Sequence, residues 1–246
     1  MSEVAKDPAL YSFLFALIPV AAMAVGAVVA AARPPGERVR SAIQHFAAGV
    51  VFAVVAVELL PDIQRSHNVL EVAGGFALGV LVMLLVERWA QAHEYAEGGA
   101  EGAAAGILTA VGVDLVLDGL LLGIAFAAGA TEGGLLAIAL ACEMLSLGLA
   151  LTVQLTRAGA STARAILIPL GLAFVTLCGG AVLGSTALTA APAWVMTVVL
   201  SFGGAALLFL VTEELLVEAH EVGETPWATA MFFLGFLVLL VLGMLG

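Results

Sequence analysis

The sequence predicts an all-α integral membrane protein with eight transmembrane helices, arranged as an inverted repeat of three, two and three helices. Of the 246 residues, 63% are hydrophobic and only 11% are charged, which leaves too little polar surface for a water-soluble domain. Charged or Pro/Gly-rich joints divide the chain into eight apolar runs, each close to the roughly twenty residues that a bilayer requires. The chain also resembles itself at an offset of five spans.

The predicted spans follow one another with short joints, apart from an acidic stretch between the third and the fourth span. They fall near 10–32, 41–62, 71–90, 103–128, 134–156, 163–187, 193–217 and 227–245. No soluble domain fits between them, so residues 1–246 are expected to form a single transmembrane domain. The first run lacks a basic n-region and a clear cleavage site, which favours a retained span over a signal peptide.

Lysine and arginine predict the orientation, because they are concentrated in cytoplasmic loops. If the N-terminus is outside, Lys6 and Arg65 are the two basic residues on the outer side. The inner loops then hold the other six, which are Arg33, Arg38, Arg40, Arg88, Arg157 and Arg164. We therefore expect a multi-pass protein of the inner (plasma) membrane with both termini outside.

An internal similarity predicts the inverted repeat. A shift of 156 residues places Phe46 on Phe202, and Glu58-Leu-Leu on Glu214-Leu-Leu. Because this shift covers five spans, the second copy runs through the bilayer in the opposite direction, as in secondary transporters. Spans four and five become the unpaired central pair. Substrate sites in such folds lie near the midplane at the repeat interface.

Ionisable side chains lie in the middle of these two central spans. Asp114 and Asp118 are four residues apart in span four, so they share one face of a helix. Cys142 and Ser146 have the same spacing in span five, with Glu143 beside Cys142. A carboxylate at bilayer depth costs roughly 2.5 kcal/mol or more, and a bound cation would offset that cost. The alternative is a packing cluster of protonated acids joined by hydrogen bonds.

Two further acids predict the ends of a cation path. Glu58 lies towards the outer end of span two, and Glu214 lies towards the inner end of span seven. The formal net charge of -11 favours a cation as partner and disfavours nucleic acid. The two cysteines, Cys142 and Cys178, lie within apolar spans and indicate no disulfide framework.

Three motifs resemble the ZIP (Zrt-, Irt-like protein) family. They are Asp118-Gly-Leu-Leu-Leu-Gly-Ile-Ala-Phe126, the stretch from Leu208 to Glu221 with its Glu-Glu-Leu-Leu core, and the Leu-Leu-Pro-Asp62 ending of span two. The resemblance covers the whole chain and implies eight spans. It also implies a homodimer that carries a divalent metal cation into the cytoplasm, with zinc as the first candidate and iron or manganese as alternatives.

The resemblance also assigns the metal site, with departures. The family's motifs in spans four and five correspond to Asp114 to Gly119 and to Cys142 to Leu147. Leucines replace donors at Leu115 and Leu147, and Ile168 stands near the place of an acid that some bacterial members have in span six. These changes remove a second metal position. One site remains, formed by Asp114, Asp118, Cys142 and Glu143, with Ser146 as a marginal ligand.

Two alternative functions remain open. A ZIP-like protein with so many replaced ligands could bind or sense metal without transporting it. An intramembrane metal-dependent hydrolase would need an open metal position and a general base, often as His-Glu-x-x-His on one helix. The chain has only 4 histidines, all near loops or span ends, so we expect a transporter and not an enzyme.

Overall fold

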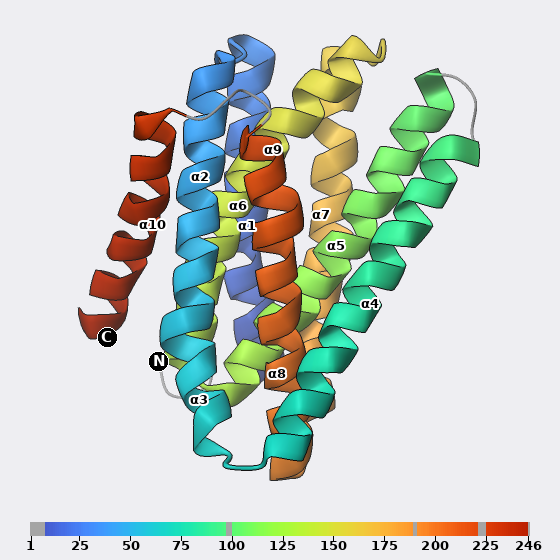
Figure 1. Cartoon of the computed structure of the whole chain (residues 1–246). Coiled ribbons are helices and arrows are strands. Elements are labelled where there is room, and N and C mark those ends of the chain that lie inside the picture. The colour runs from blue at the N-terminus through green and yellow to red at the C-terminus, as the bar shows by residue number, and fades with distance from the viewer. Residues whose placement is uncertain (1–7, 97–99, 189–190, 221–224, 246) are drawn as a thin grey trace.

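The structure is a computed structural model that describes residues 8–96, 100–188, 191–220 and 225–245. In these residues the chain forms helices only, which line up as eight rods (Figure 1). Six rods are single helices: α1 (Pro8–Ala32), α4 (Val69–Ala96), α5 (Ala100–Ala128), α6 (Ala130–Arg157), α7 (Thr162–Leu188) and α10 (Pro226–Leu245). Each of the other two has three parts: α2 (Glu37–Val54), η2 (Val55–Leu59) and α3 (Leu60–Arg65), then α8 (Ala193–Phe209), η3 (Leu210–Leu215) and α9 (Leu216–His220).

The rods agree with the apolar runs in the sequence. Within the described residues, seven of them are long and apolar enough to cross a membrane, namely all except α5. The prediction of an all-helical, multi-pass membrane protein is therefore confirmed. The remaining rod, α5, is the one that carries Asp114 and Asp118.

Successive rods run in opposite directions, so α1 begins and α10 ends at the same end of the bundle, the lower end in Figure 1. We call this the terminal end. The opposite end, where α2 begins and α9 lies, is called the distal end (Figure 1).

The rods pack in two groups. In the first group α1 packs on α6 and α7, and α5 packs on α7. In the second group α2 packs on α10, and α4 packs on α8. The contacts of α2 with α6 and of α4 with α5 join the two groups.

Glycines bring the backbones of the second group close together. A Cβ atom built on Gly79 of α4 would lie 2.6 Å from the carbonyl oxygen of Phe202 in α8. One built on Gly235 of α10 would overlap the carbonyl oxygen of Phe46 in α2. Only a residue without a Cβ atom permits such an approach, which strengthens van der Waals packing between membrane helices.

Two rods contain a turn of π-helix. The segment Val55–Leu59 joins α2 to α3, and the segment Leu210–Leu215 joins α8 to α9. Single π turns inside α-helices are rare and occur frequently at functional sites. Each of these turns carries acidic residues, with Glu58 in the first turn, and Glu213 and Glu214 in the second.

Candidate metal centre

Three carboxylates from α5 and α6 meet inside the bundle. Asp114, Asp118 and Glu143 each offer an oxygen, and the three oxygens lie within 4.8 Å of one another. Ligands on a metal with bonds of about 2.1 Å are separated by roughly 3 to 4 Å, so small side-chain adjustments would place all three on one ion. Among the described residues, this is the one group of three or more acidic, histidine or cysteine ligands at such a distance.

Burial makes this cluster electrostatically unusual. Asp118 is 1% exposed and Glu143 is 3% exposed, while Asp114 is half-buried. No lysine or arginine among the described side chains is buried. Like charges a few ångströms apart repel strongly where water does not screen them, so the cluster favours a cation.

Close helix packing fixes the carboxylates in place. Gly119, next to Asp118, lies against the backbone carbonyl of Leu177 in α7, and Gly148 of α6 lies against that of Met23 in α1. A Cβ atom on either glycine would overlap the facing oxygen. The α5 and α6 helices also contact each other. They are thus held by α7 and α1 with their acidic faces together.

The other two predicted ligands belong to α6. Cys142 is half-buried and packs against the hydrophobic core, and its sulfur is not among the ligand atoms that lie within 4.8 Å of one another. Ser146 is 2% exposed and lies three residues beyond Glu143 on the same helix. The roles of Cys142 and Ser146 as ligands stay predictions.

Glu58 lies apart from the cluster, near the terminal end. Its Oε1 atom lies against Gly243 of α10, and a Cβ atom built there would be 2.9 Å from it. Asp62 and Glu132 are close enough to act electrostatically on the Glu58 carboxylate. The sequence interpretation missed Glu132, whose one signal is an acidic residue in the first turn of α6. Glu214 lies in η3, and its side chain is outside the described part of the structure.

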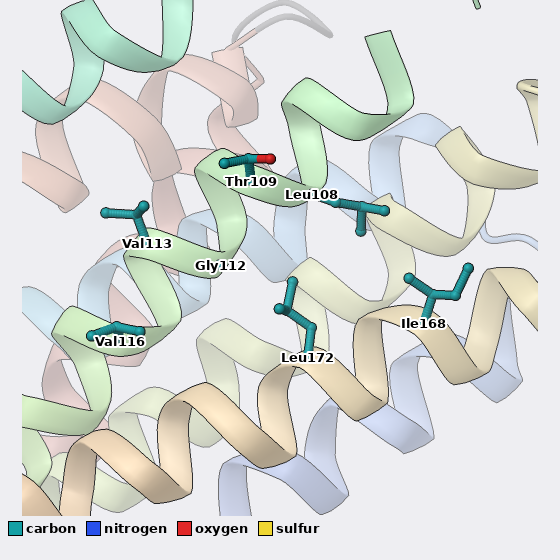
Figure 2. A pocket seen from close by; sticks show the side chains of 7 residues that line it. All are labelled: Leu108, Thr109, Gly112, Val113, Val116, Ile168 and Leu172. Atoms are coloured by element: carbon teal, nitrogen blue, oxygen red, sulfur yellow. The ribbon is translucent and has the colours of Figure 1, made fainter. Parts of the chain in front are cut away.

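A groove between α5 and α7 is a separate feature. It has a volume of about 650 Å³, and Figure 2 shows Ile168 and Leu172 of α7 facing residues of α5 across it. Its lining is apolar except for the Thr109 hydroxyl, and none of the three carboxylates contributes to it. Ile168 lines this groove and is 45% exposed. It stands near the position at which the family resemblance led us to look for an acid in span six, so that position lies at the surface of the bundle.

The helices and their buried acidic cluster define a multi-pass membrane protein with a candidate cation site. No protein-family model matches the chain. The chain is 33% identical over 212 residues to the zinc transporter GufA of Myxococcus xanthus, in an alignment that covers 80% of this chain and 82% of GufA. At that identity and coverage the two are homologous, and the chain belongs to the ZIP family, as GufA does.

Proposed function

We propose that this protein transports a divalent transition-metal cation through the carboxylate cluster of Asp114, Asp118 and Glu143. The observation that carries the proposal is that oxygens of all three side chains lie within 4.8 Å of one another, with two of the side chains buried. Packing alone needs no carboxylates at this depth, because serine, threonine and glycine do it at lower cost. The relative GufA is a zinc transporter, which supports the same role here.

Zinc is our first candidate for the cargo, with iron and manganese as alternatives. Carboxylate oxygens bind all three ions, so the cluster itself does not discriminate sharply. The relative GufA is a zinc transporter, which favours zinc among the three ions. Cys142 would add a soft donor if its side chain turned towards the ion, and a thiolate favours zinc over manganese. Ser146 would supply a weak oxygen donor.

We also propose that α5 is the eighth span and that the eight spans form the inverted repeat, as one transmembrane domain. Two features of the fold support this. The π turns at Val55–Leu59 and Leu210–Leu215 nearly coincide after a shift of 156 residues. The same shift relates the pair Gly79 and Phe202 to the pair Gly235 and Phe46, with their partners exchanged. A pseudo-two-fold axis would produce both features.

The proposed path enters at the terminal end and leaves at the distal end. Glu58 would receive the cation on the outer side, and Glu214 would release it on the inner side. The charge distribution of the loops supports this direction, because it favours both termini outside the cell and the distal end in the cytoplasm. We expect a homodimer in the plasma membrane, as the family resemblance implies.

Uptake of radioactive zinc into proteoliposomes that contain the pure protein tests the proposal. We expect saturable uptake by the parent, and none above empty vesicles for Asp118→Ala or Glu143→Ala, although both variants should insert normally. A parent that binds zinc without uptake would be the binding or sensing protein of the alternative reading. Normal uptake by either variant would remove that carboxylate from the site.

A further inference from the structure

A buried amide in α2 belongs to none of the groups described so far. Gln44 is 0% exposed, and neither Nε2 nor Oε1 of its side chain has a hydrogen-bond partner within the described part of the chain. Native proteins pair nearly all buried polar atoms, and each exception calls for a physical explanation. Here a leucine would fill similar space without the cost of burying an amide.

Two polar neighbours of Gln44 on α2, Ser41 and His45, make other hydrogen bonds. The Ser41 hydroxyl donates to the carbonyl oxygen of Ala219 in α9, at 2.8 Å. The Nδ1 atom of His45 lies 2.8 Å from the Ser41 carbonyl oxygen. This end of α2 is thereby tied to α9, and Gln44 is left out of these bonds.

Helix geometry gives the direction of Gln44. Gly49 faces α10, where it lies against the carbonyl of Phe232. At 100° per residue, Gln44 is separated from Gly49 by about 140° around the helix axis. It therefore lies on the side of α2 away from α10. The elements that α2 contacts besides α10 include α6, η3 and α9. Val51 follows seven residues later on the same face of α2.

The depth of Gln44 can be compared with that of the carboxylate cluster. The side-chain ends of Glu58 and Leu135 lie at about one level, because both are close to a Cβ atom built on Gly243. From that level, eight residues along α6 lead to Glu143 and fourteen residues along α2 lead to Gln44, both towards the distal end. At 1.5 Å per residue in the α-helical parts, and less across the π turn, Gln44 lies roughly 7–9 Å beyond Glu143.

We infer that Gln44 is a further cation-binding side chain, which contacts the ion or its hydration water between the carboxylate cluster and the distal end. This inference rests on the transport proposed above. An amide oxygen is a neutral, hard ligand for a divalent cation, and the amide N–H groups cannot compete with it for the ion. A neutral ligand suits a step that holds the ion briefly, because it binds less strongly than a carboxylate and allows release.

The test compares Gln44→Leu with the parent in proteoliposomes and in zinc titrations of the purified protein. We expect the uptake rate of Gln44→Leu to fall about tenfold, the effect of losing one contact between a charged and a polar group. Its zinc affinity at the carboxylate cluster should equal that of the parent, and its thermal midpoint should not fall. Gln44→Glu, which keeps an oxygen ligand at the same place, should retain uptake.

The matched control is Gln154→Leu, which removes an exposed amide near the distal end of α6 and should leave uptake unchanged. Parental uptake by Gln44→Leu would overturn the inference while leaving the transport proposal intact. A drop in the thermal midpoint of Gln44→Leu, with uptake lost in Gln44→Glu as well, would make the amide a structural residue and would also overturn it. A parent without uptake would refute both proposals together.

Discussion

Gly119 lies against the carbonyl group of Leu177, and this approach of α5 to α7 occurs one residue from Asp118. A Cβ atom at Gly119 would overlap backbone, which cannot turn aside as a flexible side chain can. The position of a cluster carboxylate therefore depends on a neighbouring residue that has no side chain.

Replacing this glycine should damage both the fold and the site. We expect Gly119→Ala to separate α5 from α7, to cost about 1–3 kcal/mol through overpacking, and to lower zinc uptake by displacing Asp118. Thermal unfolding in detergent and proteoliposome uptake measure the two effects. Gly179→Ala is the control, because no atom lies within 4 Å of a Cβ atom built there. Parental stability and uptake in Gly119→Ala would contradict the prediction.

Neutralising one carboxylate should stabilise the metal-free protein. Two charges within 4.8 Å of each other repel by roughly 3.5 kcal/mol or more at an effective dielectric constant of 20. Asp118→Asn removes the repulsion of Asp118 with both Asp114 and Glu143, so it should raise the thermal midpoint.

The same variant should lose the stabilisation that zinc gives the parent, which is about 2.7 kcal/mol at a hundred times the dissociation constant. Glu37→Gln, which neutralises an exposed acid of α2, should change neither quantity. An undiminished zinc-dependent shift in Asp118→Asn would place the ion elsewhere.

Removal of Glu58 should affect rate and not affinity. The structure puts Glu58 near the terminal end and outside the cluster, so Glu58→Ala should slow uptake while zinc still binds to the protein at equilibrium. We expect the same split for Glu214→Ala at the other end of the path. Glu71→Ala, in the first turn of α4, serves as the control. A variant that no longer binds zinc would show that its acid is a ligand of the bound ion.

We predict that Cys142 sets how strongly the site prefers zinc. If its thiolate turns towards the ion, Cys142→Ser should lower zinc affinity more than manganese affinity, because a hydroxyl is a hard, weak donor. Competitive titration of both metals against the parent measures the ratio. Cys178→Ser, in α7, controls for loss of a thiol elsewhere. A constant zinc-to-manganese ratio would leave a site of carboxylates alone.

The sequence was sufficient to predict the rods and to single out the acids, because both depend on local patterns. Run length identifies a helix that can cross a bilayer, and the spacing of four residues puts Asp114 and Asp118 on one face. To predict that these acids form one cluster with Glu143, it was also necessary to predict that α5 lies beside α6. The internal similarity and the family resemblance predict that α5 and α6 are neighbours.

Other features have no such local signature. Cys142 and Glu143 are adjacent in sequence, yet neighbours on a helix differ by about 100° in direction, so one can face the cluster while the other packs on the core. Gln44 is a single amide in an apolar run and gives no periodic signal. Its missing hydrogen bonds become visible only when its surroundings are known.

The π turns have a consequence for comparing this chain with its relatives. A π turn holds one residue more than the α turn it replaces, and composition does not mark the insertion. A homologue with regular helices at these places would align correctly only with a one-residue gap inside Val55–Leu59 and another inside Leu210–Leu215. Without those gaps, the residues paired with Glu58 and Glu214 would be off by one position, on a different face of the helix.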